Sequence, residues 1–254
     1  YGYNTAVGSE ALTALTTGTG CVALGADALY TSTDGDGNVA IGFSALKSAA
    51  VSEDFNIAIG YDAMKDVDEG TAGGDADHNI AIGNNALLGG DFAGNDRQLQ
   101  GNIAIGGGAL DATGTNAHTG TIAIGHQALT GLTSGINNLA IGYQALATTD
   151  DGARNLAIGY AAMGANCADD NVGIGFAALN AATGSDNTAV GSYAGDALTT
   201  GGSNVVIGKS ALSTATTATA GVFIGVGAGE DISAAEALAS VVAIGTEAFK
   251  GSAS

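Results

Sequence analysis

The chain has no proline, no tryptophan and only two cysteines, and aromatic residues make up 5% of its 254 residues. A compact globular domain of this length normally packs several large aromatic side chains into its core, so the composition argues against such a core. The apolar share is nevertheless 46%, and it consists mainly of Ala, Ile, Val and Leu. We therefore expect a thin core of small and aliphatic side chains.

Positive charge is equally scarce. Six Lys and Arg stand against 25 Asp and Glu, which gives a net charge of −19. Such an acidic surface repels the phosphates of nucleic acids and of anionic membranes, so we expect neither as a partner. No apolar run approaches the ~18 residues of a membrane-spanning helix, so we expect no membrane insertion within this segment. The chain shows no signal peptide, and we interpret it as a segment of a longer fibre protein.

What the sequence contains instead is one motif, Asn-[Ile/Val/Leu]-Ala-Ile-Gly-x-x-Ala-Leu, repeated along its length. It occurs 14 times, at intervals of 16 to 23 residues and most often 17. Clear copies begin at Asn56, Asn102 and Asn155. The copies span the chain, so we predict a single repeat domain over residues 1–254.

The columns of the motif have physical meanings. Side chains alternate between the two faces of a strand, so Ile57 and Ile59 share one face and Ala58 takes the other. We expect the Ile face to line the interior, and the Ala column to let a neighbouring backbone or subunit approach. We expect the motif glycine to permit a sharp turn with positive φ, and the Ala-Leu pair after it to begin a return strand that closes the core.

Asparagine opens ten of the 14 copies. Its amide is expected to hydrogen-bond local backbone at a corner and to form a ladder with the copies above and below. One repeat buries too few side chains to offset the conformational entropy of its own backbone, so repeats must stack. We predict an all-β parallel β-solenoid of about 14 rungs, where a rung is one repeat. Helical solenoids are disfavoured because their repeats mostly have 33 residues or more.

The repeats resemble the head repeats of YadA-like trimeric autotransporter adhesins and related repeats of bacteriophage tail fibres. Residues 4–8 followed by Ala11-Leu12, and residues 187–191 followed by Ala194, carry the resemblance most closely. It implies a left-handed β-roll that forms a homotrimer at a cell or virion surface. The rungs here are longer than the compact family repeat, and no heptad stalk, neck or membrane anchor is present in this sequence.

Two other solenoid classes fit the sequence less well. Ile-Gly-x-x-Ala-Leu also fits one hexapeptide of the left-handed β-helix of acyltransferases, but that fold needs about three hexapeptides per turn and each repeat supplies one. An ice-binding solenoid needs a regular Thr-rich face, and the Thr residues here keep no register.

Catalytic chemistry finds no support in the motifs. The three histidines, at positions 78, 118 and 126, recur at no fixed place in the repeat, so we interpret them as surface loop residues. No nucleophile, phosphate-binding or dinucleotide fingerprint is present. We therefore predict no catalytic residue, no required cofactor and no enzymatic activity.

A calcium site is one candidate for ligand binding. Oxygen-bearing side chains alternate immediately before two motif strands, a spacing that opens calcium loops. The residues are Asp34, Asp36, Asn38, Asp75, Asp77 and Asn79. The alternative is an acidic corner in which Asp and Asn form turns, because the downstream Gly and bidentate Glu of an EF-hand are missing.

A receptor site is the second candidate. The position after the motif glycine holds His126, Tyr143, Tyr160 and Phe176 on consecutive rungs, which predicts an aromatic stripe. Such a stripe suits sugar rings, or it serves only as a stacked ladder that stabilises the roll or a subunit interface. Intervals of 23 residues after Gly60 and Gly83 predict loops, and Phe92 and Arg97 mark a candidate recognition tip.

Cys21 and Cys167 lie eight rungs apart, which excludes a disulfide between them if rungs stack. The function that fits best is an extracellular structural and adhesive fibre segment, on a cell surface or a virion tail fibre. Its expected partners are copies of itself, as a homotrimer, and a surface glycan or protein receptor. The alternatives are a filament built by end-to-end stacking of rungs and, less favoured, a hexapeptide-type acyltransferase.

Overall fold

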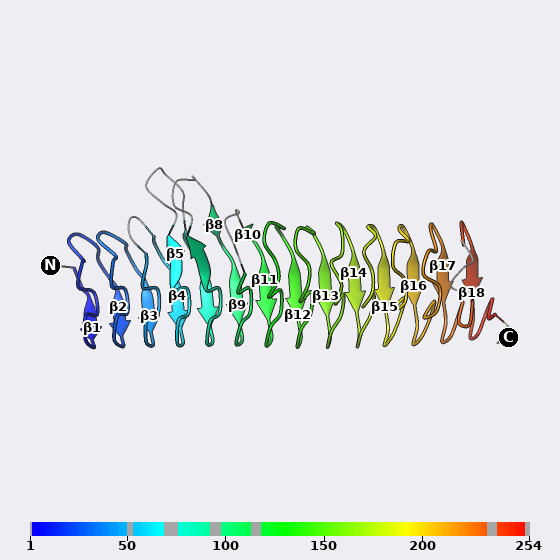
Figure 1. The fold of residues 1–254 in the computed structure, drawn as a ribbon, viewed down its shortest axis with the longest axis horizontal. Coiled ribbons are helices and arrows are strands. Elements are labelled where there is room, and N and C mark those ends of the chain that lie inside the picture. Colours follow the sequence, from blue (N-terminus) through cyan, green and yellow to red (C-terminus); the bar gives the residue numbers. More distant parts are fainter. Residues whose placement is uncertain are drawn as a thin grey trace. The chain divides into compact units, whose positions relative to one another are not determined.

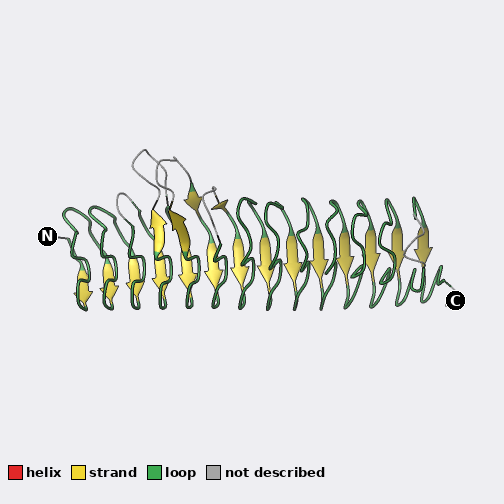
Figure 2. Cartoon of the chain, in the orientation of Figure 1, coloured by secondary structure: helices red, strands yellow, loops and turns green. Residues whose placement is uncertain are grey.

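The computed structural model describes residues 2–49, 53–68, 76–91, 98–112, 118–232 and 238–251. Strands and loops make up all of these residues, and none of them forms a helix (Figure 2). None of the described segments therefore includes a helix that could cross a membrane. The chain contains two compact units, Tyr1–Asn137 and Asn138–Ser254, each described by itself below.

The first unit contains seven short motif strands that pair in parallel, each with the strand of the next repeat (Figure 1). They are β1 (Thr5–Val7), β2 (Val22–Leu24), β3 (Val39–Ile41), β4 (Ile57–Ile59), β6 (Ile80–Ile82), β9 (Ile103–Ile105) and β11 (Ile122–Ile124).

The second unit repeats this arrangement with one strand per rung over its continuously described residues 138–232. Its strands are β12 (Leu139–Ile141), β13 (Leu156–Ile158), β14 (Val172–Ile174), β15 (Thr188–Val190), β16 (Val205–Ile207), β17 (Val222–Ile224) and β18 (Val242–Ile244). One strand per rung differs from the three hexapeptide strands of an acyltransferase turn.

Register confirms the solenoid prediction. Within each unit, every motif strand pairs with the next so that equivalent motif positions lie side by side, as in Ala140↔Ala157 and Ile158↔Ile174. The parallel sheet follows from the sequence, because a repeat of nearly constant length returns the chain to the same edge after each rung. The fold is therefore an all-β parallel β-solenoid.

The prediction that the Ile face lines the interior is wrong. The middle residue of each motif strand is buried from β2 to β18, and it is usually the alanine. The flanking Ile, Val and Leu residues point outward and are half-buried or exposed, with Ile207 37% and Ile244 66% accessible. The physical reason is the narrowness of the rung, because a column of alanines leaves room inside for the large side chain that follows the glycine.

That large side chain is the main filling of the core. Leu146, Met163 and Leu179 are fully buried, as are the alanines directly before them. The segment is a turn rather than the predicted return strand, because residues two and four places after the motif glycine have positive φ, as in Gln144 (53°) and Leu146 (53°). These left-handed residues curl the chain so that the Leu side chain points back at the alanine column.

The motif glycine is required for the expected reason and for a second one. Gly142 has a φ of 137°, in the region that favours glycine. A Cβ on Gly142 would also lie 2.4 Å from the carbonyl oxygen of Gly159 on the next rung. Any side chain at this column would therefore push stacked rungs apart.

Exceptions in the core columns compensate one another in volume. Phe223 replaces an inward alanine, and its ring occupies the space that Gly221 and Gly229 leave open, where an added Cβ would lie 2.4 Å and 2.7 Å from ring atoms. Likewise Gly173 replaces an inward alanine beside Met163, whose Cγ lies 2.7 Å from the missing Cβ. The core keeps its packing density although individual positions vary.

Three successive intervals of the first unit, between Gly60 and Gly125, add short strands outside the motif sheet. β5 (Asp66–Asp68) pairs with β7 (Gly89–Asp91), and β8 (Leu99–Gln100) pairs with β10 (His118–Thr119) (Figure 1). The intervals that we predicted as loops therefore partly continue the stacking of rungs. The candidate recognition residues Phe92 and Arg97 lie outside the described residues.

Candidate functional site

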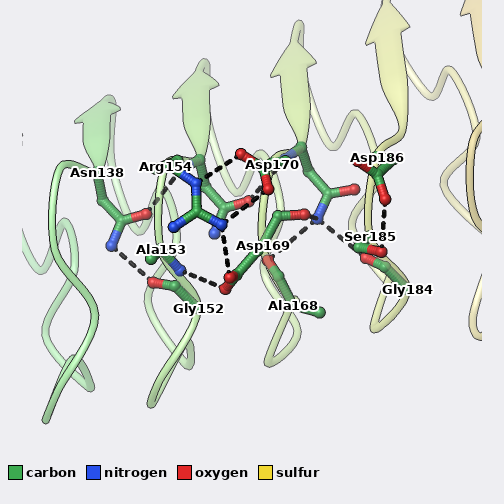
Figure 3. Close-up of polar contacts among 12 residues, drawn as sticks. Asn138, Gly152, Ala153, Arg154, Ala168, Asp169, Asp170, Gly184, Ser185 and Asp186 are labelled. Carbon is green, nitrogen blue, oxygen red and sulfur yellow. Dashed lines mark hydrogen bonds and ion pairs between the residues drawn. The ribbon is translucent and has the colours of Figure 1, made fainter.

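The asparagine column forms the predicted ladder. In the second unit, Asn155, Asn171 and Asn187 each donate a backbone N–H to Oδ1 of the asparagine one rung earlier, over 2.9 to 3.0 Å. The amide groups of the column also donate to carbonyls of the next rung, as Asn138 Nδ2 does to Gly152 O at 2.7 Å (Figure 3). In Asn138, Asn171 and Asn187 both halves of the amide bond adjacent rungs, which is the arrangement that makes a buried polar group stabilising, whereas Asn155 Nδ2 is buried without a partner among the described residues.

An ion-pair cluster lies next to this ladder and was missed by the sequence reasoning. Arg154 donates Nε to Asp170 Oδ1 at 2.7 Å and Nη2 to Asp169 Oδ2 at 2.7 Å (Figure 3). These hydrogen bonds raise the pKa of Arg154, and the bond from Arg154 lowers the pKa of Asp170. The available signal was the one-repeat spacing of Arg154 and Asp170, which stacks opposite charges. The pair is exposed, so it contributes little to stability.

The described calcium candidates make hydrogen bonds within and between rungs. Asn38 and Asn79 are fully buried members of the ladder, and Asn38 Oδ1 accepts the Asn56 N–H at 2.9 Å. Asp36 Oδ1 accepts the Thr19 N–H at 2.6 Å, and Asp77 Oδ1 accepts the Asp54 N–H at 2.7 Å.

These aspartates thus cap the backbone of a neighbouring rung. Asp34 accepts a hydrogen bond from Thr33 Oγ1 at 3.2 Å, and Asp75 lies outside the described residues. Over the described ranges, no group of three His, Cys, Asp or Glu side chains could hold a metal ion.

In the first unit, carboxylates stacked on successive rungs affect the pKa of the aspartate between them. Asp54 lies in the column between Asp36 and Asp77, and its carboxylate accepts the Asp36 N–H at 2.6 Å. Burial raises the pKa of Asp54, and the negative charges of Asp77 and Asp36 act in the same direction against the lowering effect of that hydrogen bond. The described carboxylates of the acidic corner thus cap backbone groups of neighbouring rungs, and calcium binding there stays a prediction.

The aromatic stripe is present in the second unit. Tyr143 stacks on Tyr160 with ring centroids 5.2 Å apart and planes 7° apart, and Tyr160 stacks on Phe176 at 5.1 Å and 7°. Tyr193 extends the stack edge-on at 5.2 Å and 62°. The sequence reasoning missed Tyr193 because it lies two residues after its glycine, in a left-handed conformation (φ 57°), rather than one. The four rings are 41–49% accessible.

Ring orientation bears on what this stripe recognises. The rings of Tyr143, Tyr160 and Phe176 are nearly parallel, so each turns its faces toward its neighbours and its edge toward solvent. A sugar ring packs on an aromatic face, and such faces are covered within this stack. The geometry thus favours the alternative, a stacked ladder, over the sugar-binding strip.

The first unit has a shorter version of the same column. Phe43 stacks on Tyr61 with centroids 5.3 Å apart and planes 13° apart. His126, predicted to begin the four-rung stripe, belongs to the first unit, whereas the described stack belongs to the second.

One histidine and both cysteines are buried within their rungs. His118 is fully buried, with Nδ1 3.3 Å from Gly135 O, so its assignment as a surface loop residue is wrong. Cys21 and Cys167 are both buried free thiols, in agreement with the expected absence of a bridge between them. Burial raises the pKa of both thiols, so both are neutral at physiological pH.

The outward face of the motif sheet is the surface that the sequence reasoning assigned to the interior. In both units it presents two columns of Ile, Val and Leu, with Thr5 and Thr188 as exceptions, one on each side of the column of inward residues. In the second unit the aromatic stack continues this face past the motif glycines. Searches against family models, curated proteins and solved structures match nothing to this chain.

Proposed function

We propose that this chain is a structural and adhesive segment of an extracellular fibre, self-associating as a homotrimer and attaching to a glycan or protein on another surface. The observation that carries the proposal is the rung-to-rung bonding, in which buried asparagines and backbone groups connect each repeat to its neighbours. A protein whose repeats contact only their neighbours is a linear scaffold that lengthens by one rung per repeat.

Charge supports an extracellular setting for such a scaffold. A net charge of −19 on 254 residues keeps the surface hydrated and limits nonspecific association with acidic cell surfaces. The proposed adhesion then depends on specific contacts made by the arcs that connect one motif strand to the next.

Adhesion is tested by coating beads with the chain and measuring their retention under flow on arrays of glycans and extracellular-matrix proteins. We expect retention on at least one surface, abolished by excess soluble chain. Beads coated with an unrelated protein of matched size and negative charge are the control. Equal retention of both bead types on every surface would overturn the adhesive function.

A further inference from the structure

The outward face of the second unit is apolar over its full set of motif strands. Each of the seven strands β12 to β18 turns two residues outward, and Thr188 is the only one of these that is not Ile, Leu or Val. Isoleucines such as Ile158 and Ile174 directly face one another in neighbouring strands, so the side chains form straight, evenly spaced columns. Aliphatic columns of this kind normally face a packed layer rather than water.

The aromatic stack borders this face. Tyr143, Tyr160 and Phe176 each follow an outward isoleucine by two residues, across the motif glycine. The charged side chains of the Arg154 cluster lie just before the motif asparagines, at the opposite end of the strands (Figure 3). The face thus has an apolar centre, an aromatic border and a charged border, which is the anatomy of a protein interface.

The size of this face fits a stable contact. At a strand spacing of ~4.8 Å and a rise of ~3.3 Å per residue, seven strands of three residues cover roughly 330 Å². Taking ~200 Å² for a whole aromatic side chain, the four rings at 41–49% accessibility add about 350 Å². The sum of about 680 Å² lies within the ~600–1,000 Å² per partner of a standard interface and above the ~300–600 Å² of the largest apolar patch on a typical monomer.

The distribution of charge favours a second copy of the chain as the partner on this face. Two copies of a chain with a net charge of −19 repel each other wherever carboxylates meet. The two outward strand columns of the second unit carry no charged residue, so an identical face is a tolerated neighbour there. A second copy also presents side chains at the same rung spacing, which lets the ridges of one face enter the grooves of the other.

We infer that a second copy of this chain packs on the outward face of β12 to β18, with the aromatic stack at the border of the contact. The inference deepens the proposed self-association by naming the surface that makes it. It reverses the sequence-based expectation that the alanine column allows subunits to approach, because those alanines are buried within the rung.

The test replaces Ile158 and Ile174 together with lysine and measures association by sedimentation velocity over a concentration series. Both residues point outward and are half-buried, so the fold is expected to survive, as checked by circular dichroism and thermal unfolding. The matched control is Thr183→Lys with Thr200→Lys, which adds the same charge at exposed positions of the same unit. A milder pair, Tyr160→Ala with Phe176→Ala, serves if the first variant unfolds.

We expect the unaltered chain and the control to associate alike, and I158K/I174K to associate at least about tenfold more weakly. The inference is overturned if the folded I158K/I174K variant, or the folded alanine pair in its place, associates as tightly as the control. In that case self-association stands but uses another surface. If the unaltered chain is monomeric up to about 100 μM, the homotrimer itself fails, whereas adhesion is judged by bead retention.

Discussion

Cys21 occupies the place of a ladder asparagine and takes over one of its two roles. Its backbone N–H still makes the ladder bond by donating to Asn4 Oδ1 at 2.8 Å, and its thiol donates to Gly35 O at 3.1 Å. The thiol reproduces the amide donor but offers only a weak acceptor to the next rung. The substitution shows that a rung can lose the acceptor half of the amide while it keeps the donor half.

Both thiols are expected to resist alkylation in the folded chain. Burial raises the pKa of Cys21 and Cys167, so little thiolate forms at pH 7.5, and neither sulfur is accessible. Iodoacetamide labelling followed by mass spectrometry should show two labels in denaturant and almost none without it. Rapid labelling of either cysteine in the native chain would contradict its described burial.

Asp111 provides a residue-level test of pH dependence. Burial raises its pKa above the unfolded value, so its contribution to stability is fully present below the unfolded pKa and is lost as pH rises through the folded pKa. Asp111→Asn should therefore raise Tm at pH 7 by about 2 °C and lose this advantage near pH 3.

Asp170→Asn is the control, because its stability difference from the parent should change with pH in the opposite direction. Arg154 lowers the pKa of Asp170, so the stability from Asp170 is present above its unfolded pKa and is lost as pH falls through the folded one. Calorimetric scans from pH 3 to 7 compare both variants with the parent chain. The same pH trend for both differences from the parent would contradict these assignments.

For the motif strands, the alternation of side chains between two faces was predictable, but which face points into the rung was not. Ile158 and Ala157 are both apolar, so period two separates the faces without saying which one is inside. The space inside a rung decides this, and that space is set by Met163 or an equivalent Leu four residues after the glycine. The signal was present in the exceptions, because Phe223 in the alanine column coincides with Gly229 in the leucine column.

The candidate sites likewise have features that the sequence predicts and features that it does not. The aromatic column was predictable because equal spacing stacks equal residues, and Tyr143, Tyr160 and Phe176 do stack. Tyr193 was not, because its ring joins the stack through a left-handed backbone that spacing alone does not show. At the acidic corner, sequence spacing does not reveal that Asn38 turns inward and joins the asparagine ladder.

The ladder is expected to contribute strongly to stability. Asn187 accepts the Asn204 N–H at 3.2 Å and donates to Gly201 O at 3.0 Å, both in buried surroundings. Asn187→Ala leaves these two groups unpaired and should lower the free energy of unfolding by about 2–5 kcal/mol.

Asn166→Ala is the matched control. Asn166 is exposed and accepts one bond, from the Asp150 N–H at 2.9 Å, so its loss should cost under ~1 kcal/mol. Urea unfolding measures both variants. Equal losses would mean that buried ladder bonds contribute no more than a surface bond.

The compensating volumes in the core predict that two substitutions there have non-additive effects on the free energy of unfolding. Phe223→Ala alone leaves a cavity at a fully buried ring and should cost about 3–5 kcal/mol. Gly229→Leu alone forces its side chain into that ring, because even a Cβ would lie 2.7 Å from it. The double variant F223A/G229L restores the Ala and Leu of an ordinary rung.

We expect the double variant to be more stable than either single variant, with a coupling energy of at least about 2 kcal/mol from urea unfolding. Additive losses would indicate that Phe223 and Gly229 do not share one space.

For the whole molecule, the same repeat that builds the fold also exposes an apolar surface along its motif strands. Inward alanines make the rung thin, and the aliphatic side chains that a thicker rung would bury are left on the outside. A chain with a net charge of −19 then combines a repulsive surface with an uncharged sheet face. Self-association through that face is the consequence we expect at this scale.

The most direct test of the account is a distance series along the second unit by pulsed electron paramagnetic resonance. Spin labels are placed on cysteines that replace Tyr143 together with Lys209, Val226 or Thr246, which occupy equivalent positions four, five and six rungs away. Excess unlabelled chain suppresses distances between copies. Stacked rungs predict backbone separations of about 19, 24 and 29 Å, increasing by ~4.8 Å per repeat. Separations that do not increase with each added repeat would contradict the solenoid.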